Sequence, residues 1–476
     1  MKAFKNLLIF TLIFANFHLL SSPNSQALEE SIEENWMGIY SDDKRVGFSH
    51  TSILRKDGFT KVYELTNFKI NLLGEDREVF SEATYKLQNY KILTFEYEMS
   101  SDNINLKARG NREDKGLAIT LETVSGKSER FLSIDRELVL LSLVPEILTR
   151  NNLRPADEYE FSIFEPLSVL MGINVNKSTH RIGNLESIEI PLGKFDTYKV
   201  ISDLNGVEII SWITSEGKVI KQESPPDLVA IRESKKDILD KKNKSFNIIQ
   251  KTSIPSNKKI KDPSKLQALT IKLGGIDFNE FKLEDGYRQK IIDDYIVIES
   301  KKPVSKEISY TLPYKFKEFR EYTQADFLIQ SDDEEIIQAT NKILDGERNP
   351  KTAAKKINNW IYKNIKKSPT VSLPNAKDVL NTKVGDCNEH AALFSAMARA
   401  AGIPTKTVLG VMYYDNSFYY HAWNEVLLDN WVAVDSTYGQ FPADATHIKL
   451  IEGNFAKSAE ISKLVGKLNI EIIDAS

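Results

Sequence analysis

Alternation of apolar and polar residues is the dominant pattern in the first part of the chain. Apolar residues occupy every second position in three runs, at residues 93–99, 104–109 and 117–121. In the first run Leu93, Phe95 and Tyr97 share one face. A period of two is typical of antiparallel strands with one buried face and one wet face. We therefore expect residues 28–225 to form an antiparallel β-rich domain.

Two local patterns refine this domain. Residues 207–213 and 219–221 are strand-like and flank the short sequence Ser-Glu-Gly, which predicts a hairpin. The apolar stretch at residues 138–148 predicts a helix that covers one face of the sheet.

The alternation ends at residues 226–265, where lysines and prolines dominate. One interpretation is a basic patch for an acidic polymer such as a cell-wall component. We favour a solvated linker, because acids are interspersed among the lysines and aromatic residues are not interleaved with them. Residues 266–321 then form a small β-rich segment, either a second module or the remainder of a split first domain.

Helical patterns begin at about residue 322. Ser331 with Glu334 predicts a capping box at the start of a helix that extends to residue 343. Asn349 followed by Pro350 predicts the start of a second helix. Strand patterns follow these helices further along the chain. We therefore predict that residues 322–476 form an α+β domain.

The first 27 residues have the pattern of a secretory signal peptide. Lys2 and Lys5 precede an apolar run at residues 7–17, and small residues precede a cleavage site after Ala27. The alternative of an uncleaved anchor is disfavoured, because the apolar run is shorter than the roughly 20 residues that span a membrane. We expect a periplasmic or secreted protein with no stable membrane insertion after cleavage.

Composition excludes several classes of protein. With 41% hydrophobic and 27% charged residues, the chain of 476 residues is not a polytopic membrane protein, a disordered chain or a fibre. Removal of residues 1–27 takes two of the 63 basic residues and none of the 67 acidic ones, which leaves a mildly acidic protein. This balance predicts no nucleic-acid partner. A single cysteine, Cys387, rules out an intramolecular disulfide.

Cys387 is predicted to lie at the start of a helix. Asp386 can cap this helix, Glu389 completes a capping box, and Gly402 marks its end near residue 401. Backbone N–H groups and the positive end of the helix dipole surround a sulfur at such a position. We expect this position to lower the pKa of the thiol and to stabilise an oxyanion beside it. The alternative is a buried, inert thiol.

A nucleophilic cysteine needs a base, and the base needs an orienting group. His421 begins a predicted strand, and Asp435 ends the next one. A regular two-residue turn in this hairpin would send the two side chains to opposite faces. We therefore predict a three-residue loop, 428–430, with Asn430 in the left-handed conformation. This register pairs Trp423 with Asp435 and places His421 diagonally beside the carboxylate.

The sequence GDCNEHAALFSAMARAAGIP, followed by HAWNEVLLDNWVAVDST, resembles the transglutaminase-like superfamily, thiol enzymes with a papain-like arrangement of catalytic residues. The resemblance covers about residues 322–455 and implies a C-terminal transglutaminase-like catalytic domain. It implies that Cys387 is the nucleophile, His421 the general base and acid, and Asp435 the residue that orients the imidazole. His447, in the sequence GQFPADATHIKL, also fits bacterial members, with no chemical role assigned to it.

Other candidate residues are weaker. His390 lies three positions after Cys387 on nearly the same helix face, where packing explains it better than a role as base. His50 and His180 lie in the β-rich half and are expected to be structural or exposed. The sequence contains no paired-cysteine motif, zinc-protease motif or calcium-loop pattern, so we expect no metal and no cofactor.

Together these residues predict an exported thiol enzyme that acts on amide bonds of a protein or peptide substrate. A Cys-His-Asp triad forms a thioester, which water resolves in a protease or amidase and an amine resolves in a transamidase. Hydrolysis is slightly favoured, because nothing in the sequence indicates a dedicated amine site. The alternative is a non-catalytic module that binds a peptide or cell-wall polymer on the same fold. The β-rich half is expected to position or restrict the substrate.

Overall fold

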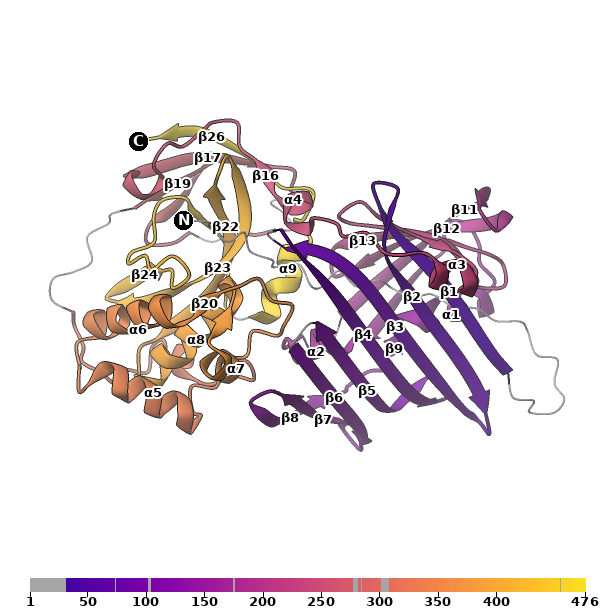
Figure 1. The fold of residues 1–476 in the computed structure, drawn as a ribbon, viewed down its shortest axis with the longest axis horizontal. Helices are drawn as coiled ribbons and strands as arrows, with labels where there is room; N and C mark the ends of the chain where they lie inside the picture. The colour runs from indigo at the N-terminus through magenta and orange to yellow at the C-terminus, as the bar shows by residue number, and fades with distance from the viewer. Residues whose placement is uncertain are drawn as a thin grey trace. The chain divides into compact units, whose positions relative to one another are not determined.

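The computed structural model describes residues 31–476 with gaps at residues 73, 102–103, 174–175, 277–280, 284, 301–307 and 454. The predicted signal peptide, residues 1–27, lies outside the described residues. The described chain forms two compact units, residues 31–248 and residues 249–476 (Figure 1). No helix in the described ranges is long and apolar enough to cross a lipid bilayer.

Residues 31–248 form one sheet of 15 strands. Two antiparallel meanders, β1 to β8 and β10 to β15, join where β1 pairs with β15, and β9 pairs with β10 in parallel. The strands are β1 (Ser31–Ser41), β2 (Lys44–Lys56), β3 (Phe59–Leu72), β4 (Glu75–Gln88), β5 (Lys91–Ser101), β6 (Ile104–Glu113), β7 (Gly116–Thr123), β8 (Gly126–Ser133), β9 (Val139–Leu140), β10 (Glu158–Phe164), β11 (Asn176–Ile190), β12 (Gly193–Leu204), β13 (Val207–Ile213), β14 (Val219–Ser224) and β15 (Leu228–Arg232). The predicted antiparallel, β-rich first half and its hairpin between β13 and β14 are confirmed.

One face of this sheet is buried, as the alternating pattern predicts. Phe95 and Tyr97 of β5 are 1% and 5% exposed. Leu93 does not share that face, because the pairing of β4 with β5 shifts register after Lys86 and Ile92 takes the core position. Such a β-bulge adds one residue to a strand and changes the alternation on its far side. The expectation for Leu93 is therefore wrong, whereas that for Phe95 and Tyr97 is confirmed.

The apolar stretch at residues 138–148 is only partly helical. It contains β9 and a 3₁₀ turn (Leu141–Leu143) before helix α1 (Val144–Arg150) begins. Pro145 lies in the first turn of α1, where its missing N–H is tolerated. Because proline disrupts a helix interior, the helix cannot start further back along the stretch. A second short helix, α2 (Pro166–Leu170), also belongs to this unit.

Residues 226–265 contain more regular structure than a solvated linker would. Strand β15 pairs with both β1 and β14, so it is an internal strand of the large sheet. Leu228 and Ala230 alternate on its buried face, a short pattern that the surrounding lysines obscure in the sequence. The elements that follow are α3 (Lys235–Asp240), α4 (Ile248–Thr252), β16 (Ile254–Pro255) and a 3₁₀ turn (Pro263–Lys265).

Residues 249–476 combine helices with three small sheets, which confirms the predicted α+β class. One sheet has the order β16-β23-β22-β25 with β24 paired to β23, a second has the order β18-β19-β17-β26, and a third joins β20 to β21. The strands are β17 (Ala268–Gly274), β18 (Gln289–Ile292), β19 (Tyr295–Glu299), β20 (Lys366–Lys367), β21 (Val384–Gly385), β22 (Thr405–Tyr414), β23 (Ser417–Leu428), β24 (Asn430–Val434), β25 (His447–Gly453) and β26 (Asn469–Ala475). The helices are α5 (Glu334–Leu344), α6 (Pro350–Asn364), α7 (Ala376–Thr382), α8 (Cys387–Ala400) and α9 (Ser458–Ser462).

Helix α8 is the centre of this unit. It contacts α5, α6 and α7 as well as β22 and β23, and Figure 1 shows the three helices gathered around it. Residues 389–399 are all buried, so the helix is enclosed on every side, and Leu393, Phe394 and Met397 are completely buried. A helix that is hydrophobic all round is buried in a core. Packing therefore fixes the start of α8, where Cys387 lies, against the sheet.

The starts of the neighbouring helices are set by side-chain caps. Asn349 caps α6 by accepting a hydrogen bond from the backbone N–H of Thr352, and Pro350 occupies the first turn, as predicted. Helix α5 differs from the prediction, because Asp333 and not Ser331 is its cap. The Asp333 carboxylate accepts from two backbone N–H groups of the first turn, and a charged acceptor competes well for that position.

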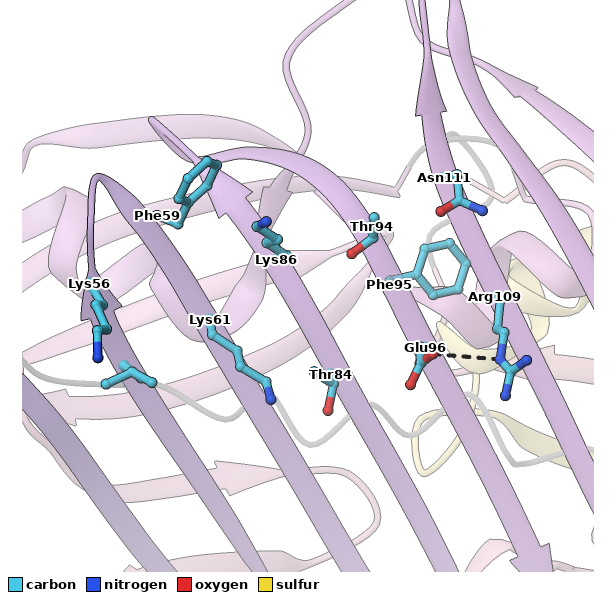
Figure 2. A pocket seen from close by; sticks show the side chains of 11 residues that line it. Lys56, Phe59, Lys61, Thr84, Lys86, Thr94, Phe95, Glu96, Arg109 and Asn111 are labelled. Carbon is cyan, nitrogen blue, oxygen red and sulfur yellow. Dashed lines mark ion pairs between the residues drawn. The ribbon is translucent and has the colours of Figure 1, made fainter.

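A shallow groove of about 470 Å³ lies on the sheet of residues 31–248 (Figure 2). Its lining comes from β2 to β6 and includes Lys56, Lys61, Lys86 and Arg109. The eleven lining residues include no cysteine, histidine or serine. Arg109 lies 3.6 Å from Glu96, and the Lys86 ammonium lies 4.3 Å from the centre of the Phe59 ring. These contacts describe a solvated, mixed-charge sheet face.

Candidate active site

Cys387 is the first residue of α8, as predicted. The Asp386 carboxylate accepts from the Asn388 backbone N–H at 2.9 Å, and the Glu389 carboxylate accepts from the Asp386 N–H at 2.9 Å, which completes the capping box. A Cβ at Gly385 would lie 2.3 Å from the Glu389 Cβ, so this close approach requires glycine. Gly402 has a φ of +78° after the last turn of the helix, also as predicted.

The Cys387 thiol is completely buried and lies against β23. The backbone N–H of Ala422, the residue after His421, is close enough to act on the sulfur. Burial raises the pKa of the thiol well above its ordinary value, and the Asp386 carboxylate adds to the rise, whereas the Ala422 N–H opposes it. The expected lowering of the thiol pKa is therefore wrong for this closed arrangement. Loss of water around the sulfur outweighs the favourable helix position.

The hairpin that follows has the predicted odd loop. Leu427 pairs with Trp431, and the pairing continues to Asn424 opposite Val434, which sets Trp423 opposite Asp435. The left-handed residue is Asp429, with a φ of 64°, and not Asn430. Its carboxylate accepts from the Ser309 N–H at 2.9 Å, a tertiary contact that favours aspartate at the tip of the loop.

His421 and Asp435 lie on the same face and form a hydrogen bond. The His421 Nε2 is 2.8 Å from the Asp435 Oδ2, and both side chains are buried. Nδ1 is therefore the ring nitrogen of His421 that does not bond to the Asp435 carboxylate. The other carboxylate oxygen, Oδ1, accepts from the backbone N–H groups of Thr437 and Tyr438 at 2.7 and 3.2 Å. Asp435 is thus held in place by both of its oxygens.

Asp435 also binds a second imidazole, that of His447. The His447 Nε2 lies 3.0 Å from the Asp435 Oδ2, and its Nδ1 lies 3.2 Å from the Asp444 Oδ1. Burial alone lowers the pKa of His447, but the hydrogen bonds and charges of Asp435 and Asp444 outweigh it and raise the pKa to about 9. His447 is therefore an imidazolium between two carboxylates at neutral pH. Burial likewise works against the charge of Asp435, yet the two histidines hold its pKa below the usual range.

The segment that carries His447 is anchored by a buried arginine. The Arg288 guanidinium donates to the backbone carbonyls of Ala443, Asp444 and His447. Gln440 holds the Asp444 carboxylate through a hydrogen bond of 2.8 Å. Local sequence patterns predict no role for His447, although an aspartate lies three residues before it. The long-range pairing of β25 with β22 brings it to Asp435.

Three atoms of this cluster have the chemistry of metal ligands. One ligand atom each of His421, Asp435 and His447 lies within 4.8 Å of the other two. Catalytic zinc sites use three protein ligands, and each ligating imidazole must present a nitrogen without a proton to the metal. Here the Nε2 atoms of His421 and His447 both hydrogen-bond to the same oxygen of Asp435, and His447 is protonated at both ring nitrogens because each one faces a carboxylate. The donor set fits a hydrogen-bond network better than a metal centre.

The competing histidines have structural surroundings. His390 Nδ1 lies 2.6 Å from the Asp386 carbonyl oxygen and burial lowers its pKa, so it is a neutral ring tied to its own helix. His50 stacks on Trp36 with ring centres 3.8 Å apart, and His180 lies between two serine hydroxyls. Trp423 belongs to a buried cluster and packs edge-on against His447. These positions agree with the expected structural roles.

Comparison with known proteins identifies the domain. The family model described as transglutaminase-like superfamily matches residues 337–436. The kyphoscoliosis peptidase of Mus musculus is 38% identical over 84 residues, which cover 15% of this chain and 12% of that protein. An uncharacterized protein of Haemophilus influenzae is 32% identical over 111 residues, which cover 22% of this chain and 28% of that protein. The chain thus spans less than a third of the length of these curated relatives.

A solved structure of a candidate cysteine protease from Cytophaga hutchinsonii is also similar. It has a TM-score of 0.31 and 17% sequence identity, and the match covers 44% of this chain and 84% of that one. The resemblance that the cysteine and histidine motifs carry is confirmed by the family model. Residues 337–436 of this chain form a transglutaminase-like superfamily domain.

Proposed function

We propose that the chain is an exported thiol enzyme that cleaves amide bonds of a protein or peptide substrate through Cys387, His421 and Asp435. The observation that carries this proposal is the buried His421–Asp435 pair beside a cysteine at the start of a helix. Distant relatives named as peptidases agree with a protein substrate. Export rests on the signal-peptide pattern of residues 1–27 alone.

In the first step His421 takes the thiol proton while Sγ attacks the carbonyl carbon of the scissile amide. Because Nε2 is bonded to Asp435, the proton goes to Nδ1. The carbonyl oxygen gains the negative charge, and backbone N–H groups at the start of α8 can donate to it. Asp435 stabilises the imidazolium that forms, as the third member of a triad does.

In the second step the imidazolium gives its proton to the leaving amine, and the carbon–nitrogen bond breaks to leave a thioester on Cys387. Water then attacks this thioester, with His421 again as base, to release a carboxylic acid and the free thiol. An amine in place of water would give transamidation. We favour hydrolysis, because the named relatives are peptidases.

A second candidate function is a non-catalytic binding module. The observation in its favour is the complete burial of the thiol and its raised pKa. Tyr438 contributes to this closure, since its ring lies 5.7 Å from His421 and most of it is buried. In the catalytic proposal the turn that carries Tyr438 moves aside when a substrate binds.

Mass spectrometry separates the possibilities. A peptide library is incubated with the wild-type protein, with Cys387→Ser and with His421→Ala, in the presence of a primary amine. Peptide fragments indicate proteolysis, a gain of about 1 Da indicates deamidation, and loss of about 17 Da together with addition of the amine indicates transfer, as one thioester intermediate dictates. Products that persist in both variants, or no products from the wild type, would support the binding module and contradict the proposal.

A further inference from the structure

A lysine lies beside the candidate nucleophile without a role in the chemistry described above. Lys367 belongs to β20, which pairs in parallel with β21 so that Lys367 is opposite Gly385. The adjacent Ser368 N–H donates to the Gly385 carbonyl at 3.0 Å. Because Cys387 is two residues after Gly385, this small sheet fixes Lys367 next to the start of α8.

Two aromatic rings from other elements hold the Lys367 ammonium. Its Nζ lies 4.1 Å from the ring centre of Tyr362, on α6, and 6.0 Å from that of Tyr438. The Tyr362 ring is seated on Gly439, where a Cβ would lie 2.8 Å from the ring. Tyr438 in turn contacts His421. The ammonium therefore has a defined position beside Tyr438, the residue that contacts the candidate catalytic histidine.

The charge of Lys367 is not neutralised by an ion pair within the described ranges. Asp435 is the carboxylate that acts on it electrostatically, and its Oδ2 is already bonded to two imidazoles. Burial lowers the pKa of Lys367, and Asp435 offsets only part of this effect. Its neighbour Lys383 has a similar setting, with Nζ 4.8 Å from the Trp360 ring centre and a pKa that burial lowers. A partly desolvated ammonium gains most from an anion that arrives with a ligand.

We propose that Lys367 is the anion subsite of this enzyme and binds a carboxylate that the substrate carries close to the scissile amide. Tyr362 and Tyr438 hold the ammonium by cation–π contacts. The favoured substrates are acidic peptides, in which the carboxylate is an Asp or Glu side chain or a free C-terminus. This inference rests on the proposed function and specifies its substrate class.

Alkylation of Cys387 tests the subsite without any substrate. Iodoacetate and iodoacetamide have similar size, and both form the same carbon–sulfur bond with loss of iodide, but only iodoacetate carries a carboxylate. We expect the ratio of the iodoacetate rate to the iodoacetamide rate to exceed that of free cysteine. Lys367→Met should lower this ratio about tenfold, as expected for loss of one nearby charge at a partly exposed site. Lys367→Arg should retain it.

The neighbouring Lys366 provides a matched control, because it is exposed and the substitution Lys366→Met removes the same charge. The ratio should be unchanged in this variant. A ratio for Lys367→Met within twofold of the wild-type value would overturn the anion subsite and leave the catalytic proposal intact. A thiol that reacts with neither reagent until the wild-type protein is denatured would overturn an anion subsite that small carboxylates can reach, and the catalytic proposal is then decided by peptide turnover.

Peptide turnover gives a second measurement. Matched peptides carry Glu or Gln beside the scissile amide, or a free or amidated C-terminus, and kcat/KM is measured for each pair. We expect the wild-type protein to prefer the acidic member of one pair about tenfold, mainly through KM, and Lys367→Met to lose the preference. The pair that responds identifies the source of the carboxylate. Turnover of both members at equal rates by the wild type would refute the subsite, whereas absence of Cys387-dependent turnover would refute the proposed function.

Discussion

A charged His447 makes the stability of residues 249–476 depend on pH in a specific direction. Its pKa is raised from 6.5 in the unfolded chain to about 9 in the fold by the carboxylates of Asp435 and Asp444. A basic group with a raised pKa contributes stability that is fully present below pH 6.5 and is lost as pH rises through about 9. Substitution by glutamine keeps a hydrogen-bond donor toward Asp435 but removes the charge. The difference in stability between wild type and His447→Gln should therefore shrink as pH rises.

The magnitude follows from linkage. Each pH unit between the two pKa values changes the free energy of unfolding by about 1.4 kcal/mol. Between pH 6.5 and pH 8.5 the wild-type advantage over His447→Gln should fall by about 2 to 3 kcal/mol. The window reaches the ordinary cysteine pKa of about 8.5 only at its upper end, and both proteins contain Cys387, so titration of this thiol does not enter the difference. Groups that both proteins share cancel in the difference.

Urea unfolding followed by tryptophan fluorescence measures this difference. Replacing Trp36 and Trp212 by Phe in every protein leaves only the three tryptophans of residues 249–476 as reporters: Trp360, Trp423 and Trp431. His390→Gln is the matched control, since burial lowers the pKa of that histidine below 6.5 and its charge changes mainly at and below the lower end of the window. If the stability difference for His447→Gln is the same at both pH values within about 0.5 kcal/mol, His447 is not an imidazolium and the shared-carboxylate argument is refuted.

Three further predictions concern the site. Asp435→Asn should lower kcat/KM about 10³- to 10⁴-fold in a peptide assay, because a neutral amide cannot stabilise the His421 imidazolium. A loss smaller than tenfold in a folded variant would show that Asp435 is not a member of the triad. Tyr438→Ala should raise the rate of Cys387 alkylation by iodoacetamide severalfold, because loss of the Tyr438 ring uncovers His421. An unchanged rate would show that another segment closes the site. Gly385→Ala should destabilise residues 249–476 by about 2 to 4 kcal/mol in urea unfolding, because the added Cβ clashes with Glu389 and breaks the capping box. Gly274→Ala is the control: a Cβ has room there, so the loss of unfolding free energy should be much smaller.

Local signals in the sequence predicted the parts of the site that depend on neighbouring residues. The capping box of Asp386 and Glu389 needs only a four-residue pattern, and it is present as predicted. The register of the hairpin followed from the requirement that His421 and Asp435 share a face, because strand parity leaves few alternatives. The same reasoning placed the left-handed conformation at Asn430, and that prediction is wrong. Asp429 takes that conformation with a tertiary hydrogen bond to Ser309, which no local pattern contains.

Features that depend on distant pairing were not predictable in this way. The role of His447 requires that β25 lie beside β22, and the role of Lys367 requires the two-residue strand β20 to find β21. The two-residue strands β20 and β21 are too short to show an alternation in the sequence, and the pattern of β25 does not specify β22 as its partner. The β-bulge that places Ile92, and not Leu93, in the core is likewise a property of the β4–β5 pair and not of β5 alone.

The charges around Cys387 argue against a thiolate that exists before the substrate binds. Burial and the Asp386 carboxylate favour the neutral thiol, and the charge of His447 is balanced by the two carboxylates that bind it. A free thiolate at this position would therefore be a buried anion near other anions. Attack on a carbonyl avoids that state, because the negative charge moves to the carbonyl oxygen as the carbon–sulfur bond forms. Proton transfer to His421 should accordingly coincide with attack, which lets one shared carboxylate, Asp435, support catalysis while the resting thiol stays protonated.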